Sequence, residues 1–157
     1  YQYLNKRFNK NNGMKLFKLA LSDKIGTVKF YDTNIEGSQS ILKPGLFAME
    51  NYNIKANKEL EVDSDLLDNV LNDTQIDCLW IDVQGAELQV LNGARESLLR
   101  TSSIFIEVSI KDRLYDDGVI MSELNKFLAE YDFTLISLGT DNRNLTGNAF
   151  YMKIKGI

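Results

Sequence analysis

The stretch LWIDVQGAELQVLNGA, residues Leu79–Ala94, decides the fold that we expect for this chain. It continues an almost unbroken apolar run, Ile76–Val83, and such a run is typical of a strand buried on both faces of a parallel sheet. The run ends at Asp82, and Gly85 follows in a predicted tight turn. From Ala86 to Arg100, apolar residues recur every three or four positions, which predicts an amphipathic helix. A buried strand, a glycine turn and a helix form half of a βαβ unit, so we predict an α/β fold.

Asp82 occupies the carboxyl end of a central strand, the position at which open α/β sheets bind ligands. A carboxylate there either belongs to a binding or catalytic site or accepts hydrogen bonds from the free N–H groups of the next helix. The position alone does not decide between these two roles. Trp80 has apolar neighbours on both sides, which favours core packing over an exposed stacking surface.

The composition indicates one domain over residues 1–157, with 44% hydrophobic and 25% charged residues. The net charge of −4 argues against a nucleic-acid backbone or an anionic membrane as the main partner. No apolar run reaches the roughly 18 residues of a membrane span, and no secretory segment is present, so we expect a cytoplasmic protein. Histidine is absent, which excludes histidine-based triads and histidine zinc sites, and the single cysteine, Cys78, excludes an internal disulfide.

Ahead of the central strand, the sequence predicts a helix, a strand pair and a long loop. Tyr1–Asn12 has helical spacing. Met14–Leu21 and Thr27–Tyr31 are predicted to be strands joined as a hairpin. Asp32–Asn53 has no regular period and is predicted to be a loop, and loops of this length are commonly functional.

The remaining elements are predicted to alternate between strand and helix and to end in an antiparallel pair. They are strand Glu59–Val62, helix Asp65–Leu71 capped within Asp63–Asp65, strand Ser103–Ile110, loop Lys111–Val119, helix Met121–Tyr131 and strands Phe133–Leu138 and Asn148–Ile154. This order predicts a layered α/β fold with a mostly parallel sheet and a C-terminal antiparallel hairpin. In that sheet, Ile76–Asp82 and Ser103–Ser109 should be adjacent parallel strands.

The segment Asp82–Ala94 closely resembles the D-V-x-G-x-E-x-x-V-L-x-G-A signature of the FkbM-type methyltransferases. Further matches stand in the family's order: ALSDKIGTVKFY at Ala20–Tyr31, GSQSI at Gly37–Ile41, DLLDNVL at Asp65–Leu71, FIEVS at Phe105–Ser109 and GNAFYM at Gly147–Met152. The resemblance covers nearly the whole chain. It implies a Rossmann-like class I methyltransferase fold, S-adenosylmethionine as cofactor, and methylation of a hydroxyl group on a sugar, glycan or polyketide-like acceptor.

The resemblance also implies where the cofactor binds. Ser22 and Asp23 would face the adenine ring, although an ordinary polar turn explains these two residues equally well. Asp82 and Gly85 would lie beside the sulfonium end of the cofactor, and Gly85 would also provide the turn itself.

Three further residues are candidates for contact with the substrate. Ser38 and Ser40 lie in the long loop and are expected to contact the cofactor or the acceptor. Glu87 stands in the first turn of the predicted helix, where the helix dipole favours a negative charge. That structural role is the alternative to a substrate contact for Glu87.

Methyl transfer to a hydroxyl group needs alignment of the two reactants and an acceptor for the hydroxyl proton. Without histidine, Asp82 and Glu107 are the best candidates for the base, because the ends of neighbouring strands would place them within about 5 Å. Two close carboxylates raise one of the two pKa values, and they are also able to bind a divalent cation, although we predict no metal site. An ion pair with Lys111 or Arg113 is the structural alternative for Glu107.

This chain differs from the family pattern at two points. The family's glycine-rich V-D-x-G-A-N-x-G turn and its F-E-P strand, which precede the matched segments, are not found here, so we expect an N-terminally truncated methyltransferase domain. Trp80 stands where the family usually has lysine. A degenerate domain that has lost the cofactor and acts as a binding module is therefore the alternative function. The lack of a G-x-G-x-x-G motif disfavours other Rossmann-like enzymes.

Overall fold

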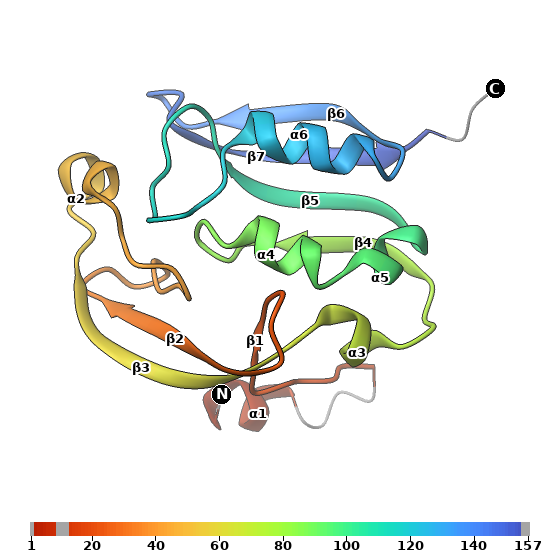
Figure 1. The fold of residues 1–157 in the computed structure, drawn as a ribbon, viewed down its shortest axis with the longest axis horizontal. Helices are drawn as coiled ribbons and strands as arrows, with labels where there is room; N and C mark the ends of the chain where they lie inside the picture. The colour runs from red at the N-terminus through yellow and green to blue at the C-terminus, as the bar shows by residue number, and fades with distance from the viewer. Residues whose placement is uncertain (1, 9–12, 155–157) are drawn as a thin grey trace.

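The computed structural model describes residues 2–8 and 13–154, and the strands in these ranges form two sheets (Figure 1). One sheet has three strands in the order β1-β3-β2, and the other has four in the order β4-β5-β7-β6. The elements are α1 (Gln2–Phe8), β1 (Ala20–Leu21), β2 (Gly26–Thr33), α2 (Leu46–Tyr52), β3 (Ala56–Asp65), α3 (Leu67–Leu71), β4 (Ile76–Ile81), α4 (Glu87–Asn92), α5 (Arg95–Leu99), β5 (Thr101–Ser109), α6 (Met121–Ala129), β6 (Phe133–Thr140) and β7 (Thr146–Lys153).

The prediction that the two central strands are adjacent and parallel is confirmed. β4 pairs with β5 in parallel, with Ile81 opposite Ile106. Asp82 directly follows Ile81 and Glu107 directly follows Ile106, so the pairing brings both acids to the same edge of the sheet. The predicted C-terminal antiparallel pair is also confirmed, since β6 pairs with β7 in that sense.

The hydrophobic core lies between the four-stranded sheet and the helices α4, α5 and α6, which Figure 1 shows in front of it. Alternate residues of the strands point into this layer and meet leucines at helical spacing, as the sequence periods predicted. The fully buried members include Leu91, Leu98, Ile104, Ile106, Val108, Leu124 and Leu128. Burying each such side chain contributes about 1.5–3 kcal/mol, so this layer fixes the position of the strand ends.

The prediction that Ile76–Val83 is buried on both faces is wrong, and so is the core position of Trp80. Only Ile76, Leu79 and Ile81 of β4 are buried, whereas Trp80 is 75% exposed. Its ring packs on that of Phe105 at a centroid distance of 4.7 Å. The reason is that β4 is an edge strand and that the helices α4, α5 and α6 lie on one face of its sheet.

The mostly parallel sheet that we expected is also wrong, because both sheets are mixed. Among the described strands, β1 with β3 and β4 with β5 are parallel, and the other three pairings are antiparallel. The predicted hairpin between the first two strands does not form, since β1 and β2 each pair with β3. The turn after β1 explains this: the Ser22 hydroxyl lies 2.8 Å from that of Ser64 at the end of β3 and accepts from the N–H of Lys24.

The single helix expected over Ala86–Arg100 is divided into α4 and α5 at Gly93 and Ala94. A Cβ at Gly93 would collide with the backbone carbonyl oxygen of Ser22, so glycine allows the chain after β1 to reach the helices. The Asp68 carboxylate then accepts hydrogen bonds from the N–H groups of Glu96 and Ser97 at the start of α5. This capping compensates the N–H groups that the interruption leaves free.

Other boundaries differ from the predictions because tertiary pairing decided them. Only Ala20–Leu21 of Met14–Leu21 is a strand, the expected loop Asp32–Asn53 contains α2, and the strand expected at Glu59–Val62 extends over the whole of β3. Asp63 and Ser64 belong to β3, and Leu66 is the N-cap of α3. The helix predicted over Tyr1–Asn12 is observed as α1, and residues 1 and 9–12 lie outside the described residues.

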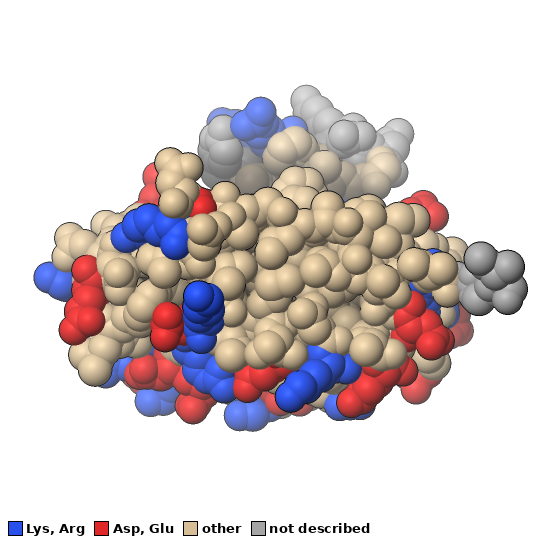
Figure 2. All heavy atoms as spheres, turned by 90° about the horizontal axis from the view of Figure 1, so that it is seen from above, with Lys and Arg blue, Asp and Glu red and all other residues tan. Residues whose placement is uncertain are grey.

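The face seen from above in Figure 1, on the side of β6 and β7, carries few charged side chains over its middle (Figure 2). Seven of the eight residues of β6 are exposed, and none of the eight is charged. Most of the charged side chains in this view lie at the rim of the face. No helix among the described residues is long and apolar enough to cross a membrane.

We predict that Gly93→Ala destabilises the protein by about 2 kcal/mol, the usual scale of overpacking, as measured by urea unfolding. The expected sign is informative, because alanine ordinarily stabilises a helical position relative to glycine by up to about 1 kcal/mol. Gly139→Ala is the matched control, since a Cβ there meets no atom within 4 Å. Equal stability of the two variants would contradict the close contact between Gly93 and Ser22.

Candidate active site

The chain leaves β4 through a left-handed turn at Gln84 and Gly85, whose φ angles are 54° and 91°. The turn needs glycine at its second position for two reasons. Positive φ is unfavourable for a side chain, and a Cβ on Gly85 would lie 2.9 Å from Cδ2 of Tyr115. The role of Gly85 in the turn is therefore clear from the geometry, whereas its contact with a cofactor stays a prediction.

The side chain of Gln84 joins the two predicted base residues. Its Nε2 donates to Oδ1 of Asp82 at 2.6 Å and to Oε2 of Glu107 at 2.7 Å. The two carboxylates thus meet at one nitrogen, as the predicted proximity of the two strand ends requires. Asp82 is exposed, whereas Glu107 is half-buried.

Burial, followed by the negative charge of Asp82, raises the pKa of Glu107 to about 8. A carboxylic acid with this pKa is largely protonated at neutral pH and loses its proton just above it. The alternative ion pair for Glu107 is not observed: Arg113 binds Glu123 in α6 at 2.7 Å, and no ion pair joins Glu107 to Lys111. Glu107 is therefore a carboxyl group with a pKa close to the physiological range.

Glu87 lies buried in the first turn of α4, with 2% of its surface exposed. Its Oε1 accepts a hydrogen bond from the N–H of Gly85 at 3.0 Å, so it braces the turn from the helix side. Burial raises the pKa of Glu87 to about 7. The structure gives Glu87 a hydrogen bond to the turn, and both its role as a charge at the helix start and a substrate contact stay predictions.

Ser38 and Ser40 hold the preceding loop against the turn. The Ser40 hydroxyl donates to the carbonyl oxygen of Gln84 at 2.8 Å, and the Ser38 hydroxyl donates to that of Ile35 at 2.7 Å. Both serines are less than 5% exposed. Their hydroxyl groups are occupied within the protein, so the structure gives them a supporting position, and contact with a ligand stays a prediction.

The sequence did not point to Gln84 or Tyr115. Tyr115, in the loop after β5, is buried, and its hydroxyl donates to the carbonyl oxygen of Ser38 at 2.8 Å and lies 3.3 Å from Oε1 of Gln84. Gln84 stands at a variable position of the signature, which drew attention away from it. An aromatic residue inside an otherwise polar loop was the only signal for Tyr115.

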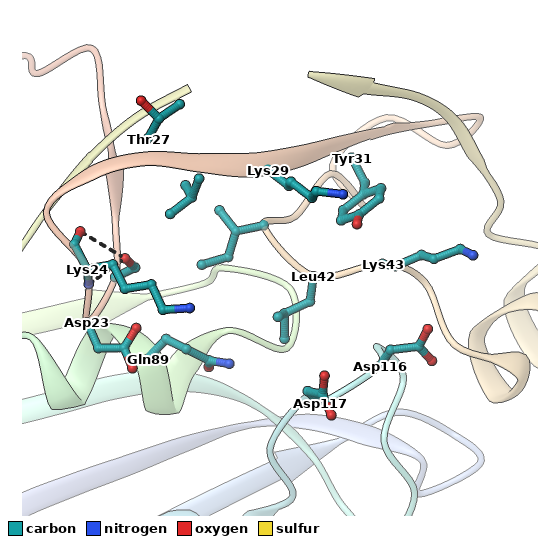
Figure 3. A pocket seen from close by; sticks show the side chains of 13 residues that line it. Asp23, Lys24, Thr27, Lys29, Tyr31, Leu42, Lys43, Gln89, Asp116 and Asp117 are labelled. Carbon is teal, nitrogen blue, oxygen red and sulfur yellow. Dashed lines mark hydrogen bonds between the residues drawn. The ribbon is translucent and has the colours of Figure 1, made fainter. Parts of the chain in front are cut away.

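A cavity of about 490 Å³ opens beside the turn that follows β1 (Figure 3). Asp23 is exposed and lines this cavity, whereas the Ser22 hydroxyl is buried and bound to Ser64. Gln89 of α4 lines it as well, and its Oε1 is buried without a hydrogen-bond partner. In Figure 3, Asp23 and Gln89 lie at one wall, and Lys29 of β2 lies at the other.

Two further cavities reach the carboxylate pair. Asp82 borders one of about 290 Å³, lined by apolar residues of β1 and by Ser40. Glu107 borders another of about 340 Å³, lined by Thr140, Asp141, Thr146 and Asn148 and by the glycines Gly139 and Gly147. Among the described residues, no three acidic or cysteine side chains lie together in a way that could hold a metal ion.

Comparisons with known proteins agree with the resemblance. The sequence model of the methyltransferase FkbM domain matches residues 2–135. The chain is 30% identical over 129 residues to the 2-O-methyltransferase NoeI of Sinorhizobium fredii (strain NBRC 101917 / NGR234), an alignment that covers 76% of this chain and 53% of that protein. The chain thus spans about half the length of this curated relative. No solved structure matches.

We predict that the free energy of unfolding falls by about 1 kcal/mol or more between pH 5 and pH 8. Glu87 and Glu107 have folded pKa values of about 7 and 8, above the 4.5 of a free glutamate, so the folded state holds protons that the unfolded chain has lost. The stabilisation is therefore complete below about pH 4.5 and is lost as the pH rises through 7 and 8.

Urea unfolding at several pH values measures this slope. Glu107→Gln should flatten it, because the amide stays neutral throughout, while Glu50→Gln on the exposed surface of α2 should leave it unchanged. A slope that Glu107→Gln leaves intact would contradict the burial of this carboxyl group.

Proposed function

Because the chain belongs to the FkbM methyltransferase family, we propose that it is part of an enzyme that transfers a methyl group from S-adenosylmethionine to a hydroxyl group. The acceptor class that we propose is a sugar, a glycan or a polyketide-like molecule. The observation that carries this proposal is the carboxylate pair Asp82 and Glu107, bridged at one nitrogen, with Glu107 at the edge of a cavity lined by Thr140, Asp141, Thr146 and Asn148.

Glu107 is the proposed base. The bound cofactor supplies a methyl group already activated on a sulfonium, so the protein has to align the acceptor oxygen and remove its proton. The ionised Glu107 carboxylate accepts that proton as the new O–C bond forms. Asp82 contributes its charge, which helps to hold the pKa of Glu107 near 8 and makes it a stronger base than a free glutamate.

The polar cavity beside Glu107 is the proposed acceptor site. Its lining combines two hydroxyl groups, an amide and a carboxylate, from Thr140, Thr146, Asn148 and Asp141. Such groups pair with the hydroxyl groups of a polyhydroxylated ligand, which both donate and accept. This composition favours a sugar or glycan among the acceptors that the family resemblance allows.

The proposed adenine site is the cavity at Asp23 and Gln89. The exposed carboxylate of Asp23 suits the exocyclic amino group of adenine, which donates two hydrogen bonds, and Gln89 lines the same cavity. Ser22 supports this site through the turn, because its own hydroxyl binds Ser64. These residues therefore fit one end of S-adenosylmethionine.

A binding module without catalysis is the competing function. It would explain the exposed Trp80, which stands where the family usually has lysine. It does not explain why a carboxyl group is kept half-buried, with a pKa near neutral, at the edge of a polar cavity. We therefore favour the enzyme. The cytoplasmic location stays a prediction.

We predict that Glu107→Gln lowers the rate of methyl transfer by about 10²-fold or more, the usual scale for loss of a general base. Asp82→Asn removes a charge that raises the pKa of Glu107, so it should lower the rate by less and shift the pH profile to lower pH. The assay follows conversion of S-adenosylmethionine with a panel of sugars and glycans as acceptors. In the unmodified enzyme, kcat/KM should rise with pH with an apparent pKa of about 8. A Glu107→Gln enzyme with full turnover on its acceptor would remove Glu107 from the mechanism.

We predict that Gln89→Leu and Asp23→Ala each weaken binding of S-adenosylmethionine by about tenfold, since Asp23→Ala removes a hydrogen-bond partner of the adenine and Gln89→Leu removes a polar side chain from the wall of its cavity. Isothermal titration of the whole enzyme of which this chain is part measures this. Asp77→Asn, at the far end of β4 from the site, is the control. Unchanged affinity in both site variants would show that adenine binds elsewhere.

A further inference from the structure

We propose that Gln84 is a positioning residue that holds the carboxylates of Asp82 and Glu107 in one arrangement, and that Tyr115 and Ser40 hold Gln84 in turn. The inference rests on the proposed function only in its statement that Glu107 of this pair is the base. The clamp itself is a property of the folded chain and is testable without an acceptor.

The first argument is the number of hydrogens available. The amide NH2 of Gln84 has two, and the two contacts of 2.6 and 2.7 Å direct one to Asp82 and one to Glu107. Two carboxylates that approach each other repel when both are charged. A shared neutral donor reduces that repulsion and fixes the distance between the two carboxylates. No cation in the ion pairs of the described residues takes this position.

The second argument is that the amide has only one workable orientation. Its Oε1 lies 3.3 Å from the Tyr115 hydroxyl, whose single hydrogen is directed to the nearer carbonyl oxygen of Ser38 at 2.8 Å. The reversed amide would put its oxygen against two carboxylate oxygens and lose both hydrogen bonds. Donation to the two carboxylates therefore specifies the orientation of the amide.

The third argument is that the backbone of Gln84 is held as firmly as its side chain. Its φ of 54° is unusual for a residue with a side chain, and the Ser40 hydroxyl binds its carbonyl oxygen at 2.8 Å. Tyr115 also packs against Gly85, the next residue. The loops that carry Ser40 and Tyr115 thus converge on Gln84, and their positions set that of the carboxylate pair.

The groups around Glu107 explain why the amide matters. The charges of Asp82 and Glu87 raise the pKa of Glu107, and the charge of Glu107 raises the pKa of Tyr115. Asp141 lies at the wall of the cavity that Glu107 borders. On the neighbouring strand β7, Asn148 stands opposite Glu107 and carries no charge. Gln84 is the hydrogen-bond donor from this set that lowers the pKa of Glu107.

The test is a pH titration of the Glu107 carboxyl carbon by NMR on the purified protein, with the signal assigned by its loss in Glu107→Gln. Gln84→Asn retains an amide and the preference for positive φ but is one methylene shorter, so it cannot reach both carboxylates. We expect it to raise the pKa of Glu107 from about 8 by about one pH unit, with the thermal midpoint nearly unchanged. Gln84→Met, which has no amide, should do the same.

Two further variants sharpen the result. Tyr115→Phe keeps the ring against Gly85 and removes only the hydroxyl, so it should shift the pKa of Glu107 in the same direction by less. Gln75→Met is the control, because the Gln75 amide donates to the backbone carbonyl of Arg100, away from the site. An unchanged pKa of Glu107 in folded Gln84→Asn and Gln84→Met would overturn the proposal.

The same variants separate this proposal from the proposed function. If Glu107→Gln retains methyl transfer while Gln84→Asn still raises the pKa of Glu107, the clamp is right and the assignment of the base is wrong. If the enzyme depends on Glu107, Gln84→Asn should lower kcat with little change in KM and move the pH profile upward by the same amount as the NMR titration.

Discussion

The parallel pairing of β4 with β5 is the constraint on which the candidate site depends. Parallel strands end at the same edge of a sheet, so one register decides which side chains meet there. With Ile81 opposite Ile106, the residue that follows each strand position is an acid, Asp82 in one case and Glu107 in the other. The register is fixed in turn by the buried face, because a slip of one residue would move Ile104, Ile106 and Val108 out of the core. Packing of apolar groups thus places two carboxylates together without any attraction between them.

Two glycines extend that constraint into the surrounding segments. Gly85 lets the chain turn back directly under the Tyr115 ring, and Gly93 lets the segment after β1 approach α4. The first contact brings the loop after β5 to the carboxylates, and the second brings Asp23 beside Gln89. Both contacts join parts of the chain that are distant in sequence. The two proposed ligand sites therefore depend on the same short region, residues 82–94, in which the family signature lies.

The sequence predicted those features that follow from local periods and missed those that depend on neighbours. The parallel pair, the helix periods and the proximity of Asp82 to Glu107 follow from runs of apolar residues and from the strand ends. The exposure of Trp80 depends on which face the helices cover, and apolar neighbours in sequence carry no information on that. The β1–β3 pairing depends on a turn held by two serine hydroxyls 42 residues apart. Gln84 escaped notice because its role comes from contacts across the sheet.

Keeping two acids, Glu87 and Glu107, away from water has a cost in stability that the fold offsets elsewhere. In water each carboxyl group would be ionised at neutral pH, whereas in the folded protein its neutral form is favoured. The raised pKa values measure this difference. A purely structural turn would be more stable with a neutral residue in place of Glu107, since burial and the neighbouring Asp82 both disfavour its charged form. A functional role in proton exchange near its pKa explains why such a destabilising group is present. The destabilised carboxyl and the amide that restrains it therefore belong to one arrangement, in which burial makes Glu107 a stronger base and Gln84 keeps it ionisable near neutral pH.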